Sequence, residues 1–447
     1  MQVIKIKKGL DIHLVGDADR TIEPIKTQWC AVKPPDFIGV FPKLHVAEGD
    51  KVKAGTVLFH DKYHENLLFT SPISGTVEAI RRGEKRVLNE IVIKSDNQDD
   101  FVNFGEADPQ KLTRYELIDK MLLGGIWNMI RQRPYSTIAN PADNPKAIFV
   151  SAFDSSPLAP DYNLIIENEA DTFQTGINVL SKLTTGKVHL NVKFGRTSEV
   201  FLKTKNAQIN HFSGAHPAGN VGTQINKIDP INKGDIVWYC NPQEVITIGR
   251  LFKSGRYDSR RIFAVTGSEI LKPHYYQAVI GTKIDKFIEN NVSDKEKRFI
   301  SGNVLTGTKI EADGFLGFYA NQLTVIPEGN HHEFMGWLAP GFKKFSFSHS
   351  FLSYLFPKKR YTIDTNLNGG QRAFVVTGEF EKIFPFDIYP MQLIKSCIIK
   401  DIDQMEQLGI YEVDEEDFAL CEVIDTSKIP IQKIIREGLD YMRTEMC

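Results

Sequence analysis

The segment HFSGAHPAGNVGTQI, from His211 to Ile225, gathers glycines around two histidines and a serine. A loop of this kind can cradle a phosphate, hold a nucleophile or ligate a metal. Gly214 and Gly219 have the spacing of a phosphate-binding loop, in which Lys and Ser or Thr come next and reach the phosphates and Mg²⁺. Asn220 and Val221 stand at those two positions. The segment therefore argues against nucleotide hydrolysis, and no dinucleotide-type GxGxxG follows any predicted strand.

The same segment also lacks the other features of a catalytic or metal site. Ser213 is not in a GxSxG elbow, and His211 and His216 have no third ligand nearby. Two interpretations stay open: a rigid turn whose glycines permit positive φ, or a ligand or partner contact through backbone N–H groups. If the first interpretation is correct, Gly219→Val should impair folding or assembly and should cause no separate loss of a catalytic step.

Other histidines do not predict a metal site either. His60 and His64 are four apart but fall in a predicted hairpin, where that spacing does not bring two side chains to one ion. The pair His331 and His332, followed by Glu333, does not form HExxH. We interpret both sets as solvated loop histidines, and we predict no catalytic residue and no metal ligand in this chain.

The segment GIWNMIRQRPYSTI is more suggestive. Trp127, Arg131, Arg133 and Tyr135 can stack on a planar carbonyl compound such as a quinone and donate hydrogen bonds to it. The alternative is a helix end with a packed tryptophan and solvated arginines.

A second aromatic and basic run, FKKFSFSHSFLSYLFPKKR, extends from Phe342 to Arg360. Six apolar side chains lie between two basic clusters, which suits a membrane-facing surface or a partner groove. The alternative is a strand and a short helix that cover the core and leave their basic ends in water.

The elements that would position these residues differ along the chain. The first hundred residues predict short strands punctuated by glycine and proline, and they resemble the β-hammerhead of biotinyl and lipoyl carriers. A carrier needs a lysine at the hairpin tip. The tip is predicted near Glu65 and Asn66, and Lys62 is offset from it. We therefore expect a carrier-like fold without a prosthetic group.

After a polar linker, the pattern changes to helices and strands. Leu112 to Ile138 begins as a helix, and from Lys146 onward strands and helices alternate, which predicts an α/β domain with a largely parallel sheet. In NPQEVITIGRLFKSG, Asn241 is the expected N-cap, Pro242 the first helical residue and Glu244 the favourable acid. Short strands with glycines follow, and the final hundred residues end in helical patterns.

Composition limits the function classes. The 447 residues carry a net charge of −2, which provides no global basic surface for nucleic acid. The five cysteines are scattered and form no CxxC, so neither a disulfide framework nor an iron–sulfur site is expected, and a reducing cytosolic environment fits best. No apolar run approaches the roughly 18 residues of a membrane span, and no signal peptide core is present.

Several motifs carry a family resemblance along essentially the whole chain. They are IKIKKGLDI, FTSPISGTV, RRGEKRVL, GGIWNMIRQRPYS, AIFVSAFDSSPLAP, LTTGKV, GAHPAGNVGT, RFISGNVLTGTK, LGFYANQLTVIPEG, VTGEFEKIFPFDIYP and LGIYEVDEEDFALCEV. In this order they resemble the A subunits of the Na⁺-translocating NADH:quinone oxidoreductases.

The resemblance completes the expected fold. It implies four regions: a biotinyl/lipoyl-like β-hammerhead domain at 1–100, a Rossmann-like α/β domain at 110–256, a β-grasp soluble-ligand-binding domain at 257–335 and a mainly helical C-terminal domain at 336–447. It also implies kinship with the flavin subunit of respiratory complex I. The glycine-rich flavin loop is absent, so no FMN site is expected.

The resemblance implies a function within a complex of six subunits, which passes electrons from NADH to quinone and exports Na⁺. This chain would be peripheral on the cytoplasmic face of the inner membrane, touching the membrane only through partners, and inactive alone. The quinone-proximal candidates are Phe37, Ile38, Trp127, Arg131, Arg133 and Tyr135. We expect no flavin, iron–sulfur cluster, biotin or lipoyl group in this chain. The alternative is a cofactor-free structural subunit that only shapes and docks onto the membrane subunit carrying the quinone site, through the run from Phe342 to Arg360.

Overall fold

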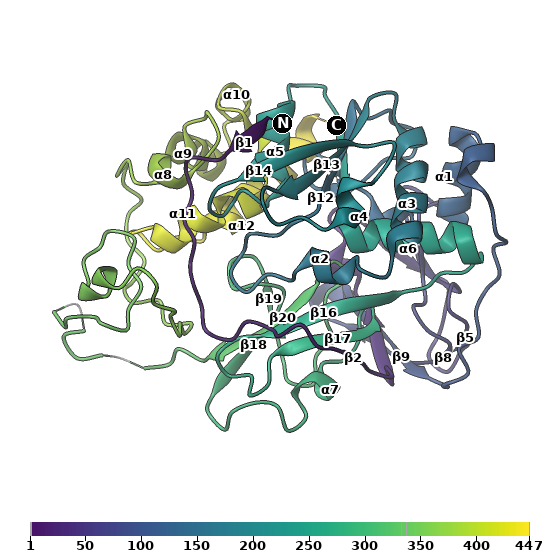
Figure 1. Ribbon diagram of the computed structural model, residues 1–447, viewed down its shortest axis with the longest axis horizontal. Helices are drawn as coiled ribbons and strands as arrows, with labels where there is room; N and C mark the ends of the chain where they lie inside the picture. The colour runs from purple at the N-terminus through teal and green to yellow at the C-terminus, as the bar shows by residue number, and fades with distance from the viewer. Residues whose placement is uncertain (1, 332, 337, 447) are drawn as a thin grey trace.

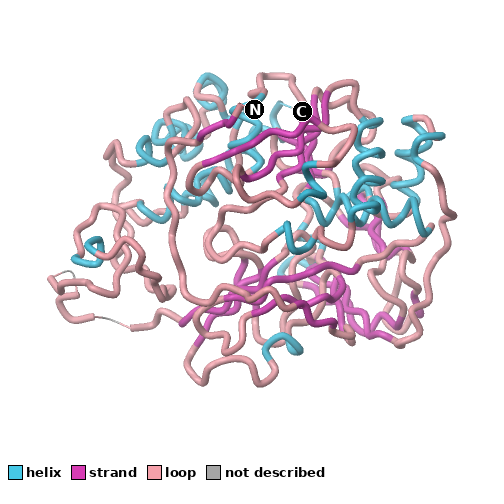
Figure 2. The backbone as a smooth tube through the Cα atoms, in the orientation of Figure 1, coloured by secondary structure: helices cyan, strands magenta, loops and turns pink. Residues whose placement is uncertain are grey.

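The computed structural model describes residues 2–331, 333–336 and 338–446 (Figure 1). Within these ranges the longer strands form four sheets of seven, six, four and three strands. Helices cover the largest sheet, and the smaller sheets lie beside it (Figure 2). None of the helices in the described part of the chain combines the length and apolar character needed to cross a membrane.

Two small antiparallel sheets pack around one core in the N-terminal region. One has the order β3 (Trp29–Val32), β9 (Leu88–Ser95), β8 (Gly75–Arg82), β5 (Lys51–Val52), and the other the order β4 (Pro42–Leu44), β6 (Val57–Asp61), β7 (Leu68–Thr70). The hairpin of β6 and β7 has Glu65 and Asn66 in its connection, which confirms the predicted tip, and Lys62 directly follows β6.

The first two strands of the chain belong to other sheets. β1 (Val3–Lys5) pairs in parallel with β14 (Gln208–Ser213), and β2 (Ile22–Pro24) pairs in parallel with β17 (His274–Val279). The predicted domain of residues 1–100 therefore contributes its first strands to its neighbours.

The seven-stranded sheet is parallel except at one edge. Its order is β1, β14, β13 (Lys187–Lys193), β12 (Ala147–Ser151), β15 (Val237–Cys240), β10 (Arg131–Arg133), β11 (Thr137–Ile138). The five strands from β1 to β15 are parallel, as the alternation of strands and helices predicts, whereas β10 and β11 form an antiparallel hairpin against β15.

Both faces of this sheet are covered, which explains why its central strands read as continuous apolar runs. Ile148 and Val150 belong to a core shared with α1 (Arg114–Leu123), α3 (Ala170–Leu183) and α6 (Pro242–Ser254). Ala147 and Phe149 belong to a second core shared with α5 (Val221–Ile228) and the C-terminal helices. Two shorter helices, α2 (Tyr162–Ile165) and α4 (Glu199–Leu202), complete the domain.

The start of α6 is fixed by local chemistry, as predicted. The Asn241 side chain accepts hydrogen bonds from the backbone N–H groups of Gln243 and Glu244, and the Glu244 carboxylate accepts one from Asn241 N at 2.6 Å. Pro242 occupies the first turn, where a missing N–H costs nothing. Helix α6 ends at Gly255, whose φ of 63° is left-handed.

The third sheet is mixed. Its order is β19 (Thr308–Ile310), β18 (Lys297–Ser301), β20 (Gln322–Pro327), β16 (Arg260–Thr266), β17, β2, and a short helix α7 (Asp285–Ile288) packs against it. Phe263, Val265, Leu323, Val325 and Phe287 form its core.

The C-terminal region is only partly helical. The expectation of a mainly helical domain at 336–447 holds from Phe380 onward, with α8 (Phe380–Ile383), α9 (Pro390–Ile399), α10 (Ile402–Gln407), α11 (Ala419–Ile424) and α12 (Ile431–Met446). The described residues between β20 and α8 are irregular apart from one 3-10 turn, η5 (Leu352–Leu355). Pro340, Pro357 and the pair Gly369–Gly370 interrupt this stretch, and its Phe–Ser alternation lacks helical spacing.

Candidate functional site

A cleft of about 510 Å³ lies where all four regions of the chain meet. One wall is made by the carboxyl ends of the parallel strands β12 and β15, between which the order of connections reverses direction. In open α/β sheets this switch point is the position at which ligands bind. Residues from all four regions line the cleft, among them Asp36, Ile38, Arg131, Asp154, His216, Tyr239, Asn241, Thr306, Tyr319, Glu415 and Glu416.

Arg131 is the central side chain of this site. It stands on β10, and its guanidinium carbon lies 4.6 Å from the ring centre of Tyr239 and 4.3 Å from that of Tyr319. The cation is therefore in cation–π contact with two aromatic rings. The buried carboxyl of Glu244 is 4.0 Å away, and Arg131 itself keeps 24% of its side chain exposed. A planar donor group is thus positioned at an aromatic wall.

A smaller pocket of about 190 Å³ adjoins the cleft and shares Arg131, Ile38, Tyr239 and Tyr319 with it. Four acidic residues form one wall of this pocket, Asp36, Asp414, Glu415 and Glu416. The last three come from the 3-10 turn η7 (Glu415–Phe418) and the residue before it.

An ion-pair network holds this acidic wall in place. Arg133 is 1% exposed and lies 3.3 Å from Asp414, 2.7 Å from Glu416 and 3.4 Å from Asp417. Arg436, from α12, lies 3.0 Å from Glu415 and 3.4 Å from Asp414.

Neutral donors extend the same network. Ser136 donates to Asp414 at 2.5 Å and accepts from the Tyr239 hydroxyl at 3.0 Å. The hydrogen bond between Ser136 and Asp414 thereby connects the hairpin of β10 and β11 to the start of η7.

The acidic groups of this region differ in pKa: although burial opposes it, the charge of Arg133 holds the pKa of Asp414 well below its usual value. Burial raises the pKa of Glu415 to about 9, and the negative charge of Asp414 adds to the rise. Burial raises the pKa of Asp417 to about 8 although Arg133 opposes it. Burial also raises the pKa of Asp36, whose carboxylate accepts from Phe318 N at 2.7 Å. With so high a pKa, the carboxyl group of Glu415 is neutral at pH 7 and can donate as well as accept hydrogen bonds.

The structure brings two of the six quinone-proximal candidates to the cavities, Ile38 and Arg131. Phe37 lies behind them, 3% exposed, with its ring 4.5 Å from that of Phe69 and 4.8 Å from that of Phe318.

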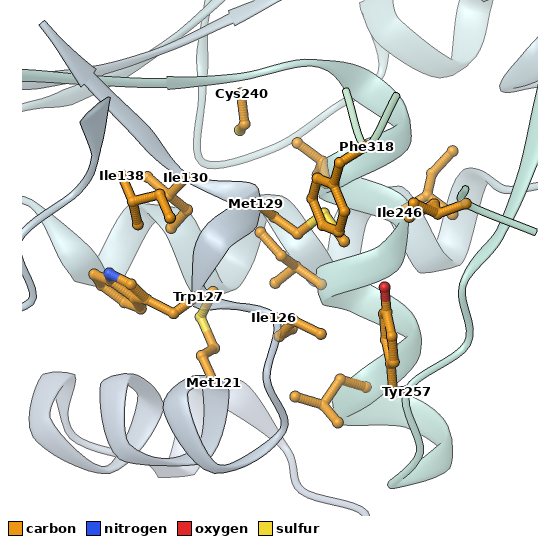
Figure 3. Close-up of a cluster of buried hydrophobic side chains, with 14 of the residues drawn as sticks. Met121, Ile126, Trp127, Met129, Ile130, Ile138, Cys240, Ile246, Tyr257 and Phe318 are labelled. Atoms are coloured by element: carbon orange, nitrogen blue, oxygen red, sulfur yellow. The ribbon is translucent and has the colours of Figure 1, made fainter. Parts of the chain in front are cut away.

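The other three candidates are enclosed by protein groups. Trp127 is 1% exposed within a buried hydrophobic cluster (Figure 3), and its indole N–H donates to Ala139 O at 2.7 Å. Arg133 is in the ion-pair network, so the alternative of solvated arginines does not describe it. The carbonyl of Tyr135 accepts from Arg436 Nη1 at 2.9 Å, and the Tyr135 ring packs edge-on against Tyr411.

The glycine-rich segment from His211 to Ile225 joins β14 to α5 and borders the cleft through His216, Gly219, Asn220 and Val221. His216 Nδ1 lies 3.1 Å from Ser155 Oγ, which accepts from Gly219 N at 2.8 Å. His216 N donates to Asp11 Oδ1 at 2.9 Å. The segment is therefore a turn, as the first interpretation expects, and its position at the cleft leaves a ligand contact through its backbone open.

The remaining histidines find other partners. His60 is on β6 and approaches His45 at 2.5 Å between ring nitrogens, so the expectation of a solvated loop histidine is wrong for it. His64 is in the hairpin connection, 2.9 Å from Asp61. His332 lies outside the described residues. Across those residues, no three His, Cys, Asp or Glu side chains gather as metal ligands do.

Sequence reasoning passed over Asp36, Tyr239, Tyr319, Glu415 and Glu416. One available signal was the predicted strand GDIVWYC followed by a capped helix, because the carboxyl end of such a strand is where α/β sites form. The acidic run DEED reads as a solvated charge cluster, and nothing in its sequence indicates burial.

Three family models match the chain. They are described as the NqrA N-terminal barrel-sandwich hybrid domain, over residues 4–96, the NqrA second alpha/beta domain, over 112–257, and the NQRA C-terminal domain, over 262–312.

Similar proteins cover the whole chain. The A subunit of the Na(+)-translocating NADH-quinone reductase of Pasteurella multocida is 38% identical over 447 residues, 99% of this chain and 100% of that protein. The corresponding protein of Hahella chejuensis is 39% identical over 448 residues, with the same shares. Among solved structures, an NAD⁺-reducing [NiFe]-hydrogenase aligns with a TM-score of 0.38 and 10% identity, and the alignment spans 75% of this chain and 64% of that one.

Proposed function

The chain belongs to the family of A subunits of the Na⁺-translocating NADH-quinone reductases, and from this premise we propose that it serves the quinone-reduction step of such a complex. In this proposal it is a peripheral subunit on the cytoplasmic face, and its partners are the five other subunits of the complex, especially a membrane subunit. The complex carries out NADH-dependent quinone reduction coupled to Na⁺ export, and the isolated chain has no activity of its own.

The observation that carries the proposal is the position of Arg131. Its guanidinium is in cation–π contact with the rings of Tyr239 and Tyr319, and Ile38 lines the same cavities. A quinone head group is a flat ring with carbonyl acceptors on its edge. Such a ring needs a flat apolar or aromatic wall and a charged donor in its plane, since hydrogen bonds from charged groups are the strong ones.

The six candidates then divide into two roles. Ile38 and Arg131 contact the ring, whereas Phe37, Trp127, Arg133 and Tyr135 hold the elements that present them. This division follows from burial: Phe37, Trp127 and Arg133 are each at most 3% exposed.

Calorimetric titration of the isolated full chain with a short-chain, water-soluble ubiquinone tests the proposal. We expect weak binding that Arg131→Ala weakens by about tenfold or more, because a hydrogen bond from a charged group contributes about 1.5–3 kcal/mol. Ile38→Ala should also weaken binding, because it removes apolar contact with the ring. Arg81→Ala, in an exposed ion pair with Glu90, is the control and should bind as wild type does. Unchanged quinone binding in both Ile38→Ala and Arg131→Ala would contradict the assignment of these residues to a quinone site.

The proposal includes the absence of resident cofactors from this chain. The purified protein should be colourless, and its intact mass should equal that of the unmodified sequence, with no arm on Lys62. An absorbance band of flavin or iron–sulfur clusters, or an added mass, would contradict this part.

A second candidate function is a cofactor-free subunit that only docks onto and shapes the membrane subunit. The exposed aromatic and basic segment from Phe342 to Arg360 favours it, because Phe342, Tyr354, Leu355 and Phe356 are each at least half exposed. Charge reversal at Lys343, Lys344, Lys358 and Lys359 should then prevent assembly of the complex. Intact assembly in that variant would remove this docking surface.

A further inference from the structure

One segment of the chain has an unusual combination of charge and exposure. We call residues 334–336 and 338–363 the arm. In Figure 1 it belongs to the green loops at the left, outside the four sheets. Between Glu333 and Asp364 the sequence has no acidic residue, yet it contains four lysines, one arginine and many aromatic residues.

The inner side of the arm is attached to the protein body. Phe345, Phe347, Tyr361 and Ile363 pack against the core that the C-terminal helices share with α5. Tyr361 also donates its N–H to His13 O at 2.8 Å and accepts from Val15 N at 3.0 Å. The arm is therefore attached to the body of the protein along one part of its length.

The outer side is apolar and faces solvent. Its exposed fractions are 95% for Phe334, 63% for Leu338, 50% for Phe342, 56% for Leu355 and 53% for Phe356. Water is a poor solvent for so many large apolar side chains in one short segment, and such patches mark contact sites.

The cations of the arm differ in their partners. Lys344 pairs with Glu333, Arg360 pairs with Asp17, and Lys359 donates to the carbonyl of Phe342. Lys343 and Lys358 are exposed and form no ion pair with any residue that the structure describes. Their charges are available to an external anion.

We propose that the arm binds an anionic lipid surface directly. The outer apolar side chains enter the boundary between head groups and acyl chains, and Lys343 and Lys358 face the lipid phosphates. This goes beyond membrane contact through partner subunits, and it does not depend on quinone binding.

Charge and composition favour lipid over a protein groove. Lysine is depleted from the cores of protein interfaces, whereas lysines beside aromatic and aliphatic side chains are typical of membrane-surface segments. A lysine stem can also lie along apolar neighbours while its ammonium group reaches the head groups. The absence of acidic residues across the arm removes the repulsion that an anionic surface would otherwise meet.

Sedimentation of the full chain with vesicles tests this inference. Wild type should sediment with vesicles of phosphatidylcholine and phosphatidylglycerol, more weakly with pure phosphatidylcholine, and less as salt rises. Lys343→Glu/Lys358→Glu should weaken binding to the mixed vesicles by about thirty-fold or more, because each lysine near a charged surface contributes about five-fold. Leu355→Ser/Phe356→Ser should weaken binding to both kinds of vesicle.

The control is Lys205→Glu/Lys253→Glu, which changes the net charge equally at two exposed lysines on the α/β domain. It should bind as wild type does, and all variants should keep the wild-type melting temperature because the altered side chains are exposed. The inference is overturned if wild type stays in the supernatant with anionic vesicles, or if the control loses as much binding as the arm variants. Failure to bind vesicles together with loss of complex assembly in the arm variants would assign the arm to a protein partner, and quinone titration would be unaffected by either outcome.

Discussion

Gly222 leaves space for the carboxylate of Asp417. A Cβ atom at Gly222 would lie 2.6 Å from each oxygen of that carboxylate, which is closer than real Cβ contacts come. Gly222 is in the first turn of α5, where the helix dipole favours a negative charge. The glycine-rich segment and the acidic wall are therefore fitted to each other.

Gly222→Ala should destabilise the protein by about 1–3 kcal/mol, because the added methyl group must push a buried carboxylate out of its ion-pair network. Thermal unfolding followed by circular dichroism measures this. Gly370→Ala is the matched control, since nothing lies within 4 Å of a Cβ there. A melting temperature of Gly222→Ala equal to that of wild type would show that the network adapts freely.

Gly219→Val should impair folding or assembly. A Cβ at Gly219 would lie 2.5 Å from Ser155 N and 2.8 Å from Ser155 Oγ, so the turn would have to separate from the loop after β12. The yield of folded chain and its incorporation into the complex are the measurements. Complexes that do assemble should turn over normally; assembled complexes with a selective loss of turnover would argue for a catalytic role of this segment.

Arg133→Ala should be strongly destabilising, by about 3–5 kcal/mol, because it removes the cation nearest to the buried carboxylate of Asp414 and leaves the guanidinium's other buried partners without a donor. Asp414, Glu416 and Asp417 all lie within 3.4 Å of this guanidinium. Urea unfolding compares it with Arg81→Ala, for which the loss should be about 1 kcal/mol or less because Arg81 is exposed. Equal effects in the two variants would mean that the buried network is not maintained in solution.

Glu415 should make the stability of the protein fall as pH rises from about 5 to about 9. Its pKa is raised to about 9 in the folded state, so the folded protein keeps a proton that the unfolded chain releases near its ordinary value of 4.5. The stabilisation is complete below the unfolded pKa and is lost as pH rises through the folded pKa, at no more than about 1.4 kcal/mol per pH unit.

Urea midpoints at several pH values between 5 and 9 test this. Glu415→Gln cannot release a proton and should give a shallower decline than wild type. Glu78→Gln, at an exposed position, should keep the wild-type slope. If the stability of Glu415→Gln declines with pH as steeply as that of wild type, a group other than Glu415 holds the proton.

Much of the local structure follows from the sequence because its causes are local. Asn241, Pro242 and Glu244 start α6 through contacts within four residues, and the turn after β6 lies where glycine and proline spacing places it. The family motifs likewise identify the chain without any coordinates. The parallel sheet follows from the alternation of strands and helices, because parallel neighbours need a crossover connection.

The composition of the cavity walls was decided by tertiary packing alone. Arg133 and Trp127 have the residue types of a binding site, yet the fold surrounds them with Asp417 and Ala139 as partners. Arg133 and Asp417 are separated by 284 positions in the chain. Patterns of periodicity and capping act over a few residues, whereas burial depends on which distant segments meet. The sequence therefore determined the elements and the family, and the packing of those elements decided that Arg131 lines the cleft and Arg133 does not.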